Sequence, residues 1–188
     1  EVNSDGTTRF NSTVRVNNIT TDAGGTTELN GNVTTPGEGT QTYQDQLQLT
    51  GPITLTAKEI DFNANVSGTG NLILRATANN DMAIGGTDNT TEALDLTATE
   101  LSFLEDGFDS ITIGRANSSD AVSVDGDVSF QDPIILHGTT TLNANLSTTN
   151  ENITIDGNTI IGGADVSLDT GTGAGTITLT DTVNGISA

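Results

Sequence analysis

Short phrases recur along the chain with small changes, and this internal repetition constrains the fold more than any other feature. The phrase "GTTELNGNVTT" (25–35) returns as "GTTTLNANLSTT" (138–149), and "GPITL" (51–55) returns as "DPIIL" (132–136). A module this short cannot bury its own apolar face, so it must stack on a neighbouring module. The repetition therefore indicates a solenoid built from strand-and-turn units of irregular spacing.

Apolar residues alternate with polar ones in most of these modules, which is the periodicity of a β-strand. Gly, Asn and Asp separate the modules and favour tight corners, because they tolerate positive φ. The expected fold is all-β, a right-handed parallel β-helix that forms a single domain over residues 1–188. We expect a loop over residues 35–46, which lack paired apolar positions and contain Pro36. The alternative is an antiparallel β-sandwich, for which Asn30-Gly31 and Asn184-Gly185 would supply hairpin turns.

Charge excludes several classes of partner. The chain has 5 Lys and Arg against 25 Asp and Glu, which gives a formal net charge of -20. A nucleic-acid-binding protein needs a basic surface, so no nucleic-acid partner is expected. The sequence has no apolar run long enough for a transmembrane helix, and no membrane insertion is expected. With no Cys in the chain, thiolate chemistry and disulfides are also excluded.

Two near-copies carry candidate functional carboxylates. "ITLTAKEIDF" (53–62) is followed by "LDLTATELSF" (94–103). On a strand, Glu59 and Asp61 project to one face, and Glu100 and Ser102 are expected to repeat that arrangement one module later. The interpretation we favour is a solvated outer face that keeps the rod soluble.

A carboxylate ladder can also bind Ca²⁺, which takes six to eight oxygen ligands. A second acidic group in "FLEDGFDS" could contribute, although its spacing matches neither an EF-hand nor a calcium-binding β-roll. No other cofactor is expected. The calcium hypothesis names these residues: Glu59, Asp61, Glu105, Asp106 and Asp109.

Enzymatic activity is not expected. Carbohydrate-active β-helix enzymes use paired carboxylates in a groove, and such an enzyme is the minor alternative. Their grooves also present aromatic and basic side chains, whereas this chain has one Tyr, no Trp and scattered basic residues. The one histidine, His137, cannot by itself form a transition-metal site or support a catalytic triad.

The repeat pattern resembles the repeat regions of large secreted bacterial surface proteins of the filamentous-haemagglutinin and adhesin type. The stretches that carry this resemblance are "GTTTLNANLSTTNENITIDG" and "LTATELSFLEDGFDSITIGRANSSDAVSVDG". The resemblance implies a right-handed parallel β-helix, an extracellular or cell-surface location, and a structural or adhesive role, with glycans or surface components as partners. It implies no catalytic residues.

The alternative function is a subunit that polymerises with copies of itself, either end to end or by donating a strand. Residues 14–16 and 177–179 are the candidate donated strands.

Overall fold

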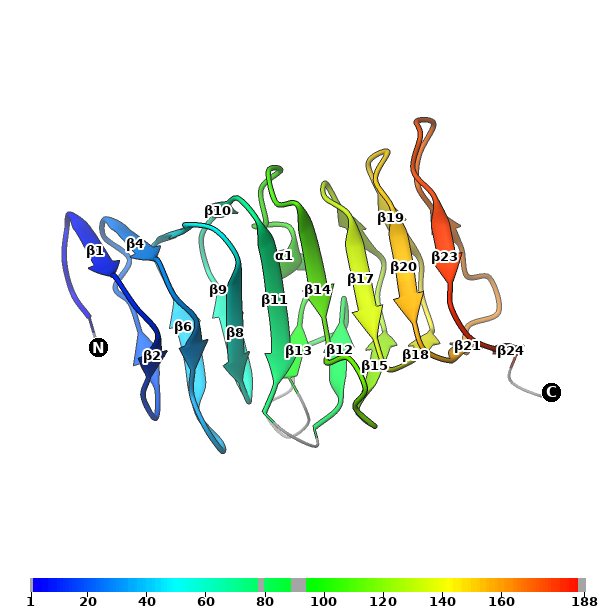
Figure 1. Ribbon diagram of the computed structural model, residues 1–188, viewed down its shortest axis with the longest axis horizontal. Coiled ribbons are helices and arrows are strands. Elements are labelled where there is room, and N and C mark those ends of the chain that lie inside the picture. The colour runs from blue at the N-terminus through cyan, green and yellow to red at the C-terminus, as the bar shows by residue number, and fades with distance from the viewer. Residues whose placement is uncertain (1, 78–79, 89–93, 186–188) are drawn as a thin grey trace.

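The chain winds as a parallel β-solenoid of about eight turns with almost no helix. The computed structural model describes residues 2–77, 80–88 and 94–185. Successive turns, here called coils, follow one another along the long axis, and the two termini lie at opposite ends (Figure 1). The predicted parallel β-helix is confirmed, and the antiparallel β-sandwich is wrong because the strand ladders are parallel.

Each coil passes through three faces. The first face contains β1 (Thr7–Phe10), β4 (Thr26–Leu29), β7 (Gln46–Leu49), β10 (Val66–Gly68), β16 (Val128–Phe130), β19 (Leu146–Thr148) and β22 (Leu168–Asp169). The second face is an eight-stranded sheet of β2 (Val14–Arg15), β5 (Val33–Thr34), β8 (Ile53–Ala57), β11 (Asn71–Ala76), β14 (Ser110–Ile113), β17 (Ile134–His137), β20 (Ile153–Asp156) and β23 (Ile177–Leu179). The third face contains β3 (Ile19–Thr20), β6 (Thr40–Tyr43), β9 (Glu59–Phe62), β13 (Leu94–Leu96), β12 (Met82–Ile84), β15 (Ala121–Val124), β18 (Thr139–Leu142), β21 (Thr159–Ile161) and β24 (Val183–Gly185).

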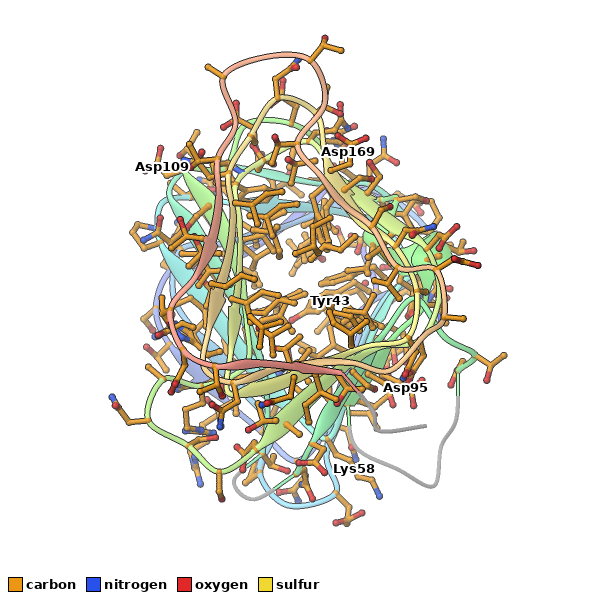
Figure 2. The ribbon with its side chains drawn as sticks, turned by 90° about the vertical axis from the view of Figure 1, so that its right-hand side faces the viewer. Tyr43, Lys58, Asp95, Asp109 and Asp169 are labelled. Carbon is orange, nitrogen blue, oxygen red and sulfur yellow. The ribbon has the colours of Figure 1, made fainter. Side chains whose placement is uncertain are left out.

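The period-two alternation of the sequence builds the interior. In β4, β6 and β9 every second side chain is buried, and the residues between them face outward. The strands of the second face stack in register, so their inward side chains form continuous aliphatic columns. One such column contains Ile53, Leu72, Ile111, Ile134, Ile153 and Ile177. Figure 2, viewed along the rod, shows side chains pointing into the space that the ribbon encloses, Tyr43 among them.

The segment expected as a loop over residues 35–46 is partly strand, because Thr40–Tyr43 form β6 and Gln46 begins β7, whereas its other residues form turns and irregular connections. It contains β6, in which Gln41 and Tyr43 point inward and are fully buried. The sequence pattern did not reveal this strand because one of its two inward residues is polar. Nε2 of Gln41 donates to the carbonyl of Thr56 at 2.9 Å, and Oε1 accepts from the Tyr43 hydroxyl at 2.9 Å. These bonds satisfy the amide inside the core.

One irregularity interrupts the third face. β13 pairs with β12, which precedes it in the chain. In the stack, however, β13 lies between β9 and β12, nearer than β12 to the N-terminal end of the rod. The chain therefore steps back by one strand before it continues. The helix α1 (Ala98–Leu101) follows β13. Within the described ranges, no helix is long and apolar enough to cross a membrane.

Candidate functional site

The interruption of the third face gathers carboxyl groups from four separate pieces of structure. β9 and β13 contact each other, but among the described residues no strand ladder joins them. The carboxylates at this break, here called the acidic break, are Glu59 and Asp61 of β9, Asp88 of the segment after β12, Asp95 of β13 and Glu100 of α1.

Strand alternation places the acids of β9 and β13 on the outer side. In β9, Ile60 and Phe62 are buried in the core, so Glu59 and Asp61 point away from it. In β13, Leu94 and Leu96 are buried and Asp95 lies between them, yet Asp95 is only 6% exposed. The break therefore holds an outward-facing carboxylate in a position that is shielded from water.

The second near-copy folds differently from the first. Residues 98–101 form a helical turn instead of a strand, so Glu100 and Ser102 do not repeat the arrangement of Glu59 and Asp61. Thr97 caps the helix, because its hydroxyl accepts from the Glu100 N–H at 3.2 Å. The Glu100 carboxylate in turn accepts from the Thr97 N–H at 2.8 Å, which completes a capping box. The expectation of a repeated strand is wrong because this capping pair stabilises a helix start.

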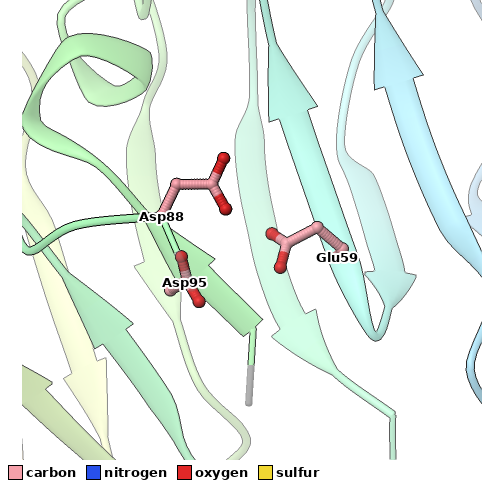
Figure 3. Close-up of side chains that lie close together, drawn as sticks. All are labelled: Glu59, Asp88 and Asp95. Carbon is pink, nitrogen blue, oxygen red and sulfur yellow. The ribbon is translucent and has the colours of Figure 1, made fainter. Parts of the chain in front are cut away.

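Three of the acids approach one another closely. One carboxylate oxygen each of Glu59, Asp88 and Asp95 lies within 4.8 Å of the others. Figure 3 shows the three side chains converging from β9, from the segment after β12 and from β13. Oxygens bound to opposite sides of one Ca²⁺ are about 5 Å apart, since each ligand distance is about 2.3–2.6 Å. The trio could therefore ligate one such ion through three oxygens, with further oxygens needed to complete its coordination.

The electrostatics of the acidic break disfavour full ionisation. Burial is the main cause that raises the pKa of Glu59 to about 8. The hydrogen bond from the Ile60 N–H lowers this pKa, whereas the charges of Asp95, Asp61 and Glu100 raise it further. Burial also raises the pKa of Asp61 and of Glu100, although hydrogen bonds from Thr42 and Thr97 partly offset it. A proton on Glu59, or a cation bound beside it, would reduce the repulsion among these carboxylates.

A pocket of about 430 Å³ opens beside the trio. Its lining residues are Asp61, Phe62, Asn63, Asp88, Thr97, Thr99, Glu100 and Phe103. Asp61 and Glu100 therefore share one pocket, which is the arrangement that acid–base chemistry would need. Among the described residues, the lining has no Lys, Arg or His to bind an acidic sugar or stabilise a developing negative charge. These residues suit a cation or a neutral polar ligand better than an anionic substrate.

The five residues of the calcium hypothesis fall into two places. Glu59 and Asp61 belong to the acidic break, whereas Glu105, Asp106 and Asp109 lie in the turn between α1 and β14. There Glu105 accepts a hydrogen bond from the Asn65 side chain at 2.5 Å. Calcium binding at either place stays a prediction.

Sequence reasoning did not associate Asp88 and Asp95 with Glu59. The alternation in "LDL" could have marked Asp95 as the outward residue of a strand. No local signal shows that β13 returns to the side of β9, so the trio could not be assembled from the sequence.

Comparisons of the chain with models of known protein families, with curated proteins and with solved structures found no match. Two features of the structure remain as a basis for inferring function. One is the solenoid of about eight turns, and the other is the acidic break in its third face.

Proposed function

We propose that the chain is a structural and adhesive segment of an extracellular surface protein, acting as a stiff rod for attachment or surface coating. The eight-stranded sheet of the second face carries this proposal, because it runs from the first coil to the last without interruption. Backbone hydrogen bonds and an aliphatic interior then connect every coil to the next. Such a rod can hold a binding surface at a distance from its anchor.

Side chains at the corners reinforce the connection between coils. Asn18, Asn32, Asn145 and Asn152 each accept, through Oδ1, a hydrogen bond from a backbone N–H of the following coil, at 2.8–2.9 Å. A corner that is tied to its neighbour resists bending better than an open loop. These asparagines support a mechanical role for the rod.

The surface chemistry suits an extracellular adhesive segment. Outward strand positions carry Thr and Ser in large number, and a net charge of -20 keeps the rods apart in solution. Glycans and other polar surface components are the proposed partners, because hydroxyl and amide groups can exchange hydrogen bonds with sugars. The resemblance to repeat regions of secreted surface proteins supports the same role.

The test combines shape and binding. Electron microscopy of the purified chain is expected to show short rods, and a glycan array is expected to retain them. Unfolded or round particles would contradict the rod, whereas rods that bind no glycan and no bacterial or host surface would contradict the adhesive role.

A second candidate is a subunit that assembles with copies of itself. It is favoured by apolar side chains that are exposed in the two segments proposed as donated strands, residues 14–16 and 177–179. Among the described residues, three large hydrophobic side chains are exposed, and these are Val16, Ile177 and Val183.

A further inference from the structure

The pocket beside the acidic break, here called the break pocket, is larger than a metal site. It encloses about 430 Å³, and pockets that hold small organic ligands enclose about 300–1,000 Å³. A single Ca²⁺ ion, whose oxygen ligands lie about 2.3–2.6 Å away, would occupy only a small part of that volume. The size of the break pocket therefore suits an organic ligand better than a bare ion.

Segments that are far apart in the sequence form the walls of the break pocket. They are the end of β9, the segment after β12, and α1 with the residues beside it. The lining residues are Asp61, Phe62, Asn63, Asp88, Thr97, Thr99, Glu100 and Phe103. The displaced order of strands in the third face brings these segments together, so the break pocket is a product of that irregularity.

The charge of the break pocket favours a cationic group. Asp61, Asp88 and Glu100 contribute carboxylates, and among the described lining residues there is no Lys, Arg or His to neutralise them. Burial raises the pKa of Asp61, and the charge of Asp88 adds to the increase. An ammonium group in the pocket would relieve this repulsion and form charge-assisted hydrogen bonds with the carboxylates.

Two of these carboxylates are already held in position by the fold. Asp61 accepts a hydrogen bond from the hydroxyl of Thr42 in β6 at 2.7 Å. Glu100 accepts from the Thr97 N–H at 2.8 Å and from the Thr97 hydroxyl at 2.9 Å. Because these side chains are ordered before a ligand arrives, binding costs less conformational entropy.

The remaining lining suits the uncharged part of a sugar. Asn63 and Thr99 are exposed, and their amide and hydroxyl groups can exchange hydrogen bonds with sugar hydroxyls. Phe103 is half-buried against the core, and its ring offers an apolar surface that also attracts cations. A lysine side chain would supply the ammonium group but no hydroxyls for Asn63 and Thr99. The whole lining therefore fits an amino sugar better than a lysine.

We propose that the break pocket binds an amino sugar with a free ammonium group, as one unit of a surface glycan. The ammonium group contacts Asp61, Asp88 and Glu100, and the sugar hydroxyls face Asn63 and Thr99. This inference rests on the adhesive function proposed above, and it specifies the site and the class of glycan.

The test compares oligomers of glucosamine and of N-acetylglucosamine, which share a ring but differ in the charged amine. Isothermal titration of the 188-residue chain is made in metal-free buffer at about pH 6.5, below the ordinary pKa of an amino group. The glucosamine oligomer is expected to bind at least about tenfold more tightly than the acetylated one. Raising the salt concentration should weaken the binding of the glucosamine oligomer.

A charge-neutralised variant locates the binding. Asp61→Asn/Asp88→Asn removes two charges at nearly constant shape, and an amide oxygen can still accept the hydrogen bond from Thr42. This variant should bind the glucosamine oligomer about tenfold more weakly or worse, with little change for the acetylated oligomer. The control Asp165→Asn/Asp181→Asn makes the same change in net charge at exposed positions of other coils and should bind like the parent.

A second variant tests the aromatic wall. Phe103→Leu keeps an apolar side chain against the core but removes the ring, so it should weaken the binding of both oligomers. Circular dichroism melting checks that every variant keeps its fold.

The outcomes separate this inference from the proposed function. Equal binding of the two oligomers, or a charge-neutralised variant that binds like the parent, would overturn the amino-sugar site, while retention on the glycan array would still support the adhesive rod. Tighter binding of an oligolysine peptide than of the glucosamine oligomer would overturn the assignment to a sugar. A folded parent chain that binds no glycan and no surface would overturn the adhesive role as well.

Discussion

At the scale of single residues, Glu59 is the side chain whose surroundings differ most from its position in the strand pattern. An outward carboxyl on a solvated strand ionises freely, whereas Glu59 lies next to Asp95 and Asp88 at the break in the third face. Its pKa is raised to about 8, mainly by burial. The ionised group therefore works against the folded state.

Replacing Glu59 with Gln is expected to stabilise the protein at high pH. Because the folded pKa lies above the ordinary value of 4.5, the neutral carboxyl suits the folded state. The stability that the neutral carboxyl contributes to the fold is fully present below pH 4.5 and is lost as the pH rises through about 8. Since the group is only partly buried, we expect Glu59→Gln to gain about 1–2 kcal/mol at pH 9 and little at pH 4.

Urea unfolding at both pH values measures this difference. Asp165→Asn is the control, because Asp165 is an exposed carboxylate far from the acidic break. A gain of equal size at pH 4 and pH 9 would show that ionisation of Glu59 is not the cause.

The acidic break also gives a calcium prediction. A cation can replace the proton that compensates charge among Glu59, Asp88 and Asp95. At pH 8 and above, Ca²⁺ is expected to raise the melting temperature of the parent chain, and Asp88→Asn should reduce that increase. Isothermal titration measures the uptake directly. If Asp109→Asn abolished the uptake instead, the ion would lie in the turn that contains Glu105 and Asp106.

At the scale of elements, the capping box of α1 determines the local fold. Thr97 and Glu100 exchange hydrogen bonds across the helix start, and Leu101 packs into the core. Thr97→Ala should cost about 1 kcal/mol of the free energy of unfolding, the typical effect of losing an N-cap. Thr99→Ala, which removes a hydroxyl from the same turn without removing the cap, should cost less in the same urea titration. Equal losses would argue against the cap.

The same elements show what the sequence could and could not predict. Alternation and repetition predicted parallel stacking, because an inward column needs only an apolar residue at every second position. They did not predict α1, since "LTATELSF" has the apolar spacing of its strand-forming counterpart. The T-x-x-E pair at Thr97 and Glu100 is itself a helix-start signal and could have separated the two. β6 was missed because Gln41 occupies an inward position and is satisfied by backbone carbonyls.

At the scale of the whole molecule, the rod is a one-dimensional stack in which each coil depends mainly on its neighbours. The interior columns explain why a chain with only 3% aromatic residues can bury a core. The pairing order of the third face could not be predicted, because it depends on contacts between segments that are distant in sequence. The acidic break follows from that order and from no local motif.

The position of β13 has a consequence for how the chain reaches its native state. A solenoid that grows coil by coil from its N-terminal end would offer β12 the open edge of β9, because β12 is synthesised first. The native order instead requires β13 to occupy the rung between them. A nascent chain must therefore hold that rung open or displace a non-native pairing. This step is expected to limit the folding rate, whereas the strands of the coils on either side pair rapidly.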